Sequence, residues 1–88
     1  MANSFAIRIT YNGIVKELQV QPEEQMQAVL QRSISLFSLQ RQPHQMGLFT
    51  EAGVQVAGPN IQQTVVQAGL KPGQLLVLRQ VVVEGGGR

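Results

Sequence analysis

Three consecutive glycines and one arginine, Gly85, Gly86, Gly87 and Arg88, stand at the end of the sequence, after a hydrophobic run. Glycine has no side chain to pack and costs the most backbone entropy to order, so three in a row add nothing to a core. They do make a slender peptide that can enter a narrow enzyme cleft. The alternative is an inert chain end, because chain ends are commonly disordered.

The chemistry open to such a segment is acyl transfer. A free glycine carboxylate can be activated as an acyl-adenylate and passed to a thiol as a thioester, because no Cβ hinders attack on its carbonyl carbon. From there it can form an isopeptide bond with an amine, or a thiocarboxylate with sulfide. Arg88 caps Gly87 with a peptide bond and blocks both routes until a peptidase removes it. Cleavage after Gly86 is the alternative register.

Composition restricts the other kinds of chemistry. The 88 residues include no cysteine, no aspartate and a single histidine, His44. A Ser-His-Asp triad, a thiol nucleophile and a cysteine-containing metal site therefore lack their residues. We expect no catalysis, no metal and no cofactor, and we expect His44 to be a solvated loop residue. A chain without catalytic groups fits a protein that other enzymes act upon.

Charge and hydropathy exclude further classes of partner. Seven basic and five acidic residues give a net charge of +2. The basic residues are scattered and do not form a stripe with aromatics, so nucleic-acid binding is not expected. No apolar run approaches the roughly 20 residues of a membrane span, and the first residues lack a signal-peptide pattern. The expectation is one small domain in the cytoplasm, without disulfides.

The first half of the chain predicts a β-hairpin and a helix. Residues 5–11 alternate apolar and polar side chains, which is typical of a strand with one buried side. Asn12-Gly13 favours a type I′ turn, and residues 14–20 form the return strand. Pro22 suits the first turn of a helix that ends before Pro43. The apolar stripe of that helix consists of Met26, Val29, Leu30, Ile34 and Phe37.

The second half predicts three more strands and a short helical turn. Residues 46–50 form the third strand, and a turn at 51–53 leads to a short fourth strand at 54–56. A single helical turn at 64–68 ends at Gly69, a natural left-handed cap. After a tight turn at 71–74, the last strand runs from Leu75 to about Val82. The order of elements places the chain in the α+β class.

This order resembles the ubiquitin-like β-grasp fold, a mixed sheet of four to five strands wrapping one helix. The segments that carry the resemblance are the opening hairpin, Val20-Gln21-Pro22, Met46-Gly47-Leu48-Phe49, and Gly69-Leu70-Lys71-Pro72-Gly73-Gln74-Leu75-Leu76-Val77-Leu78-Arg79. The last segment and the terminal glycines are its most specific parts. Two departures are the valines at 81–83, where an arginine-rich segment is typical, and the small number of lysines. The turn at 51–53 and the glutamine-rich surface look most similar to prokaryotic ubiquitin-like protein modifiers.

The resemblance implies a ubiquitin-like domain at 1–83 and a flexible glycine tail at 84–88. It implies a modifier that is processed at its glycines, adenylated, transferred as a thioester and attached to target amines. Its partners would be an activating enzyme, a conjugating enzyme, a deconjugating or processing peptidase, and the target proteins. Two alternatives remain open: a sulfur-carrier protein with a C-terminal glycine thiocarboxylate, and a non-conjugated interaction module. Lys16 and Lys71 are the possible acceptor lysines.

Strand alternation gives a prediction for the core and for a recognition surface. If Leu75 and Val77 point into the core, Leu76 and Leu78 point out. With Leu48 or Phe49 on the neighbouring strand, they would form an aliphatic patch resembling the recognition face of ubiquitin. The alternatives are a strand covered on both faces by loops, or a contact between copies of the chain. The other predicted core residues are Phe5, Ile7, Ile9, Leu18, Val20, Met26, Val29 and Leu30.

Overall fold

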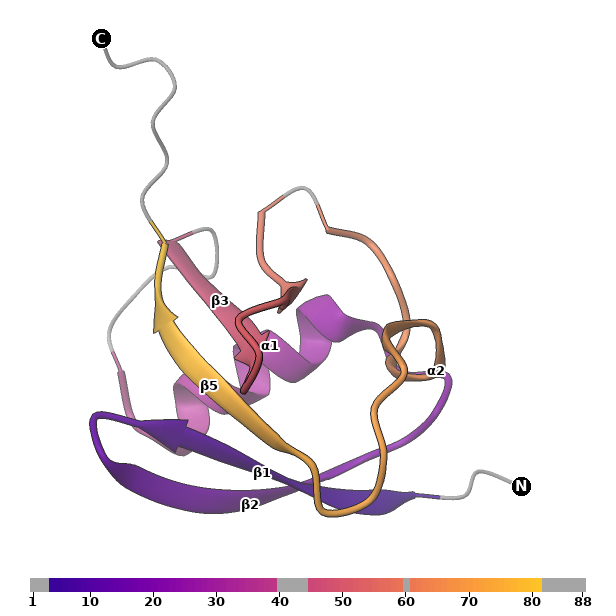
Figure 1. Cartoon of the computed structure of the whole chain (residues 1–88), viewed down its shortest axis with the longest axis horizontal. Helices are drawn as coiled ribbons and strands as arrows, with labels where there is room; N and C mark the ends of the chain where they lie inside the picture. The colour runs from indigo at the N-terminus through magenta and orange to yellow at the C-terminus, as the bar shows by residue number, and fades with distance from the viewer. Residues whose placement is uncertain (1–3, 40–44, 60, 82–88) are drawn as a thin grey trace, which may run out of the picture.

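The computed structural model describes residues 4–39, 45–59 and 61–81. These residues form β1 (Phe5–Tyr11), β2 (Ile14–Val20), α1 (Met26–Leu36), β3 (Met46–Thr50), β4 (Gln55–Ala57), α2 (Val65–Ala68) and β5 (Leu75–Gln80). The strands make one sheet in the order β2-β1-β5-β3-β4, parallel between β1 and β5 and antiparallel elsewhere. α1 lies across one face of this sheet, which we call the inner face (Figure 1). The predicted α+β class and mixed sheet are confirmed.

The opening hairpin has the predicted turn. Asn12 and Gly13 have φ angles of 55° and 83°, the positive values that a type I′ turn requires. This turn fixes the register of β1 and β2, in which Tyr11 faces Ile14 and Phe5 faces Val20. A shift of one residue would move every apolar side chain of β2 to the other face. The two residues of the turn therefore determine which side of the hairpin meets α1.

The two ends of α1 are capped differently. Gln25 precedes the helix without a side-chain capping bond. At the other end Ser38 takes φ = 56°, and its N–H donates to the Ser35 carbonyl while the Leu39 N–H donates to the Ile34 carbonyl. This pair of bonds is a Schellman motif, in which glycine usually occupies the left-handed position. A serine holds it here, so this end of the helix carries backbone strain.

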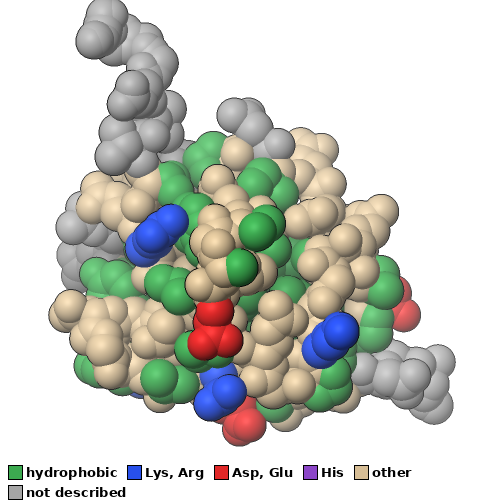
Figure 2. Space-filling view, in the orientation of Figure 1, with side chains coloured by type: hydrophobic (Ala, Val, Ile, Leu, Met, Phe, Trp, Pro, Cys, Tyr) green, Lys and Arg blue, Asp and Glu red, His purple; other side chains and the backbone are tan. Residues whose placement is uncertain are grey.

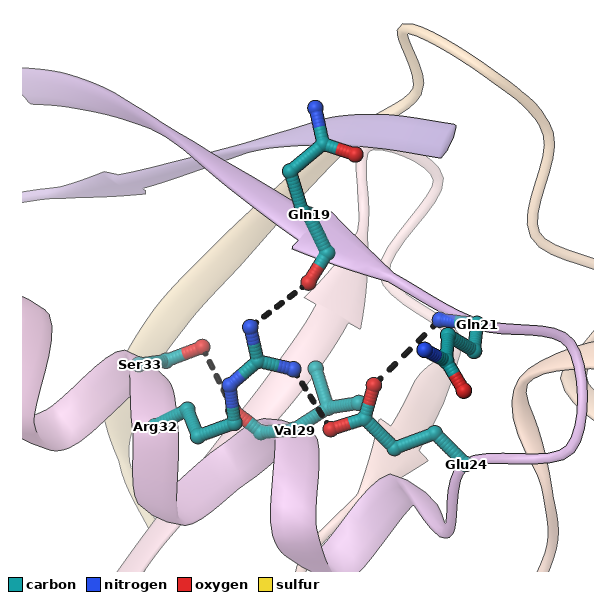
Figure 3. A network of polar contacts seen from close by, with 6 residues as sticks. All are labelled: Gln19, Gln21, Glu24, Val29, Arg32 and Ser33. Carbon is teal, nitrogen blue, oxygen red and sulfur yellow. Dashed lines mark hydrogen bonds and ion pairs between the residues drawn. The ribbon is translucent and has the colours of Figure 1, made fainter. Parts of the chain in front are cut away.

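An ion pair and two hydrogen bonds attach α1 to β2 (Figure 3). The Arg32 guanidinium pairs with the Glu24 carboxylate and donates to the Gln19 carbonyl at 2.7 Å. The second oxygen of Glu24 accepts from the Gln21 N–H at 3.3 Å. Inside the helix, the buried Ser33 hydroxyl donates to the Val29 carbonyl, so it leaves no unpaired polar group in the core.

The second half follows the prediction with small shifts. β4 begins one residue later than predicted, at Gln55, and Val54 is exposed in the turn before it. α2 begins after Thr64, which forms a reciprocal capping box with Gln67. β5 ends at Gln80, and Val82, the predicted end of this strand, lies outside the described residues. In the described part of the chain no helix is long and apolar enough to cross a membrane.

The core fills the space between α1 and the inner face. Predicted core residues that are buried are Ile7, Ile9, Leu18, Val20, Met26, Val29 and Leu30. Phe5 is half-buried and packs against them. The prediction for β5 is wrong, because Leu75 and Val77 are half-buried and do not belong to the core, whereas Leu76 and Leu78 do.

Candidate functional site: the outer face of the sheet

The predicted aliphatic patch is wrong in its residues. Leu48 and Leu76 are fully buried and Leu78 is 1% exposed, so none of the three is available to a partner. Leu76 faces Ile9 in β1, and Leu78 faces Leu48 in β3. Because side chains directly opposite each other lie on the same face of a sheet, all of them pack under α1. The patch therefore has to be sought on the opposite face.

The opposite, outer face of the sheet carries the alternate residues of the same strands. On β5 these are Leu75, Val77 and Arg79, and on β3 they are Gly47 and Phe49. The register aligns one row across all five strands, which consists of Val15, Thr10, Val77, Phe49 and Gln55. Figure 2 shows this side of the molecule, where single charged side chains stand among hydrophobic and polar ones. The row is the apolar centre of a mixed surface.

One aromatic residue on this face is almost hidden from solvent. Phe49 is 9% exposed although no helix covers it. The guanidinium carbon of Arg79 lies 3.9 Å from the centre of its ring, which is a cation–π contact. Gly47 makes room for this arrangement, since a Cβ there would lie 3.1 Å from Cε1 of Phe49 and 3.0 Å from the Ala57 carbonyl oxygen. Phe49, Arg79 and Gly47 thus form one unit, which we call the ring–arginine stack.

A second arginine on the same face has a structural task. Nε and Nη2 of Arg8 both donate to the Gly73 carbonyl, at 3.3 and 3.2 Å. The Gly73 N–H in turn donates to the Ala6 carbonyl at 2.7 Å. These bonds clamp the turn at 71–74 against β1, where Arg8 also faces Glu17 across the hairpin. The beginning of β5 is therefore held in place by β1.

The two possible acceptor lysines differ in their surroundings. Nζ of Lys16 donates to the Leu36 carbonyl at 3.3 Å and lies 5.4 Å from the centre of the Phe37 ring. Lys71 is exposed in the clamped turn, where its N–H bonds to the Gln74 side chain. No bond from the ammonium of Lys71 is found within the described ranges. If either lysine accepts a modifier, the ammonium of Lys16 must first leave these two contacts, whereas the ammonium of Lys71 has no such contact to leave in the described ranges.

The predicted conjugation residues Gly85, Gly86, Gly87 and Arg88 lie outside the described residues, as does His44. In the part that is described, no group of three His, Cys, Asp or Glu residues could hold a metal ion. Two open hollows of about 480 Å³ each lie between β2 and α1. They share Arg32, which the ion pair with Glu24 already engages. We therefore assign the candidate site to the outer face and not to these hollows.

The sequence contained a signal that shows which residues of β5 face the core. Arg79 is two residues from Val77 and four from Leu75, so all three share a face of the strand. Placing Leu75 and Val77 in the core would also bury Arg79, which is costly for an unpaired charge. The position of Phe49 carried no such signal, because Leu48 and Phe49 are both large and apolar.

Comparisons with known proteins give the fold. No protein-family model and no curated protein matches the sequence. A de novo designed protein based on ubiquitin aligns with a TM-score of 0.73 at 18% identity, over 96% of either chain. Ubiquitin from Caldiarchaeum subterraneum aligns with a TM-score of 0.69 at 22% identity, over 94% of this chain and 100% of that one. The ubiquitin-like domain of an Arabidopsis thaliana protein gives 0.72 at 9%, over 98% and 86%. At these identities the likeness establishes the fold and nothing beyond it.

Proposed function

We propose that this chain, which has the ubiquitin-like β-grasp fold, is a protein modifier that is attached to other proteins through a glycine carboxylate. The observation that carries the proposal is the position of Gly85, Gly86 and Gly87, which begin five residues after the end of β5 at Gln80. β5 is the central strand of the sheet, paired with β1 and β3. A folded body would thus present the glycines on a short segment.

The proposed chemistry needs three enzymes and no catalytic group of this chain. A peptidase hydrolyses the Gly87–Arg88 bond and frees the Gly87 carboxylate. An activating enzyme lets this carboxylate attack the α-phosphate of ATP, which releases pyrophosphate and forms an acyl-adenylate. A cysteine thiol then attacks the acyl carbon, which releases AMP and forms a thioester. A conjugating enzyme then passes the acyl group to an amine of a target and releases the thiol. In this proposal the chain is a substrate and not an enzyme. We propose that it belongs with the prokaryotic ubiquitin-like protein modifiers.

The recognition surface in this proposal is the outer face, in place of the buried leucines predicted from the sequence. Leu75 and Val77 are half-buried there, and Phe49 lies beside Val77 on the next strand. Aromatic residues and arginine are enriched at protein–protein interfaces. The ring–arginine stack supplies one of each, next to the aliphatic side chains of Leu75 and Val77 on the same face. We propose that the activating enzyme and the peptidase contact this set.

Trypsin digestion tests the proposal directly, because residues 80–87 contain no lysine or arginine. Trypsin cuts after Arg79, so a lysine modified through Gly87 keeps a branch made of residues 80–87. The chain is tagged at its N-terminus, expressed in cells of its own source, purified under denaturing conditions and digested. We expect mass spectrometry to find this branch on lysines of other proteins, and on Lys71 before Lys16 if copies modify one another.

Two variants control the test. Removing Arg88 in advance should leave conjugation intact, whereas Gly87→Ala should reduce it strongly. A branch that ends at Gly86 would support the proposal with the alternative cleavage register. Conjugates that retain Arg88, or no branch in either register under conditions where the chain is abundant, would refute it.

An interaction module without conjugation is the second candidate, because the outer face requires none of the glycines. It predicts full partner binding by a chain truncated after Val81 and no change of mass at the glycines. A sulfur carrier would show a third result, in which an oxygen of the terminal carboxylate is exchanged for sulfur and no branch appears on any lysine. One set of mass spectra therefore separates the three functions.

A further inference from the structure

Arg79 differs from the other described arginines in what its guanidinium bonds to. Arg8 donates to the Gly73 carbonyl, and Arg32 pairs with Glu24 and the Gln19 carbonyl. For Arg79, the described ranges provide no carboxylate or carbonyl acceptor, only the Phe49 ring. A guanidinium carries five N–H donors in a planar fork. Contact with a ring face uses none of them, so the fork of Arg79 keeps its donors for another molecule.

The ring–arginine stack holds this fork in place before a partner arrives. Phe49 is fixed over Gly47, where even a Cβ would be too close to its ring, and Arg79 faces Gly47 across the strands. A long side chain normally loses rotamer freedom when it binds, and a preorganised one loses less. Because Arg79 already lies against the ring, binding a partner costs it less side-chain entropy. The stack is therefore suited to bind a planar anion.

The charges nearby do not supply that anion within the described part of the chain. Glu17 faces Arg8 from β2, which is two strands away from β5, the strand of Arg79. Glu51 follows Thr50, which faces Leu76, at the end of β3 remote from the pair formed by Gly47 and Arg79. Leu75 and Val77 continue from Arg79 along the same face of β5. The free fork of Arg79 and the aliphatic side chains of Leu75 and Val77 together define the complement that the surface requires, whereas Arg8, which faces Leu75, is engaged by the Gly73 carbonyl.

We propose that Arg79 binds a carboxylate side chain of a partner protein, and that an apolar side chain next to this carboxylate lies on Leu75 and Val77. Arginine binds carboxylates in a bidentate manner, with two parallel N–H···O bonds. The guanidinium can do so in its own plane without leaving the Phe49 ring. The occupant is thus an acidic and apolar segment of another protein. This inference rests on the outer face being the recognition surface of the proposed function.

The test is an unbiased selection of peptides, which needs no conjugating enzyme. The full chain is immobilised and incubated with phages that display random peptides, and the peptides that bind are recovered and sequenced. The best peptides are then titrated into the isotope-labelled chain and followed by NMR. We expect selected peptides to carry Asp or Glu beside an apolar residue and to perturb the signals of residues 47–49 and 75–79. Exchanging the acidic residue for its amide should weaken binding about ten-fold or more.

Variants separate the effect of the planar N–H donors of Arg79 from the effect of its positive charge. Arg79→Gln should weaken binding about ten-fold, and Arg79→Lys should not restore it, because an ammonium has no fork. Phe49→Leu should weaken binding several-fold, since the apolar contact remains but the ring face does not. Lys71→Gln is the control for net charge, because it removes one positive charge from an exposed residue whose ammonium has no bond within the described ranges, and it should leave binding unchanged. Circular dichroism checks that each variant is folded.

Several results would overturn the inference. These are peptides without acidic residues, no selected peptide at all, perturbed signals elsewhere on the chain, or a Lys71→Gln variant as weak as Arg79→Gln. Phosphopeptides that bind better than carboxylate peptides would point to a different class of partner and would also overturn it. The peptide test measures no conjugation. A chain that binds such peptides but modifies no protein would therefore refute the proposed function and leave this inference intact.

Discussion

Leu75 and Leu76 offer a matched pair of substitutions that tests the orientation of β5. Truncating either leucine to alanine removes the same three carbon atoms from neighbouring positions. Leu76 is fully buried under α1, whereas Leu75 is half-buried on the outer face. Their difference in stability therefore measures which face of the strand is the core.

The magnitude follows from burial. Losing three buried carbons costs about 2.4 kcal/mol in transfer free energy, at roughly 0.8 kcal/mol for each. The cavity left behind raises the total for buried leucines to about 3–5 kcal/mol. Leu76 has Ile9 and Thr50 as cross-strand neighbours and lies in the core cluster with the α1 side chains, so little collapse is possible. We expect a loss of about 3–4 kcal/mol for Leu76→Ala, and about 1 kcal/mol or less for Leu75→Ala.

Urea unfolding and thermal unfolding, both followed by far-ultraviolet circular dichroism, measure the free energy of unfolding and the melting temperature of both variants against the parent. For a domain of this size, the expected loss lowers the melting temperature of Leu76→Ala by roughly 12–30 °C. Leu75→Ala should melt within about 8 °C of the parent. If Leu75→Ala is the less stable of the two, the orientation of β5 and the outer-face site are both wrong. Equal losses would show that both faces of the strand are covered.

Three further substitutions test other parts of the fold by the same urea titration. Ser38→Gly should raise the free energy of unfolding by about 0.5–1 kcal/mol, because glycine adopts the positive φ of this position without strain, and a Ser38→Gly variant less stable than Ser38→Ala would refute this. Thr64→Ala should lower it by about 1 kcal/mol through loss of the capping box, and an unchanged value would mean that the cap contributes nothing. Arg32→Gln should lower it by up to about 1 kcal/mol, and the difference should shrink in about 1 M salt, where ion pairs are screened; a loss that does not depend on salt would assign the effect to packing.

The sequence allowed the first hairpin and α1 to be predicted, because the spacing of their apolar residues shows which side chains face the core. Residues 5–11 alternate strictly, Asn12-Gly13 fixes the turn, and the helix has an apolar stripe at the correct spacing. Each of these signals is local, and the structure confirms the bounds of both strands. α1 is confirmed as an element but is shorter than predicted: it begins at Met26, four residues after Pro22, and ends at Leu36, before Phe37. Ser38 could not be predicted in a left-handed conformation, because the sequence lacks the glycine that usually marks it.

The candidate site was harder because the central strands have no alternation. Leu75, Leu76, Val77 and Leu78 are all apolar, so hydrophobicity alone cannot say which two face α1. The answer depends on pairing with β1, in which each paired residue is 67 positions away, as Arg8 is from Leu75 (75 − 8 = 67), and on the charge of Arg79. The contact between Arg79 and Phe49 depends on the space above Gly47, which is a property of the folded sheet. The glycines and Arg88 remain a prediction from sequence.

The position of β5 also affects how the chain is made. β5 is the last of the described elements in chain order, yet it lies in the middle of the sheet and joins the first hairpin to β3. Until residues 75–80 emerge, β1 and β3 have no common neighbour, and both present open edges. Folding is therefore expected to wait until residues 75–80 have left the ribosome, since nearly all long-range strand pairing depends on β5. A chain released early, without its glycines and without β5, would be unfolded and open to proteolysis. Synthesis itself would thus ensure that a folded copy has been translated at least as far as the strand that precedes the glycines.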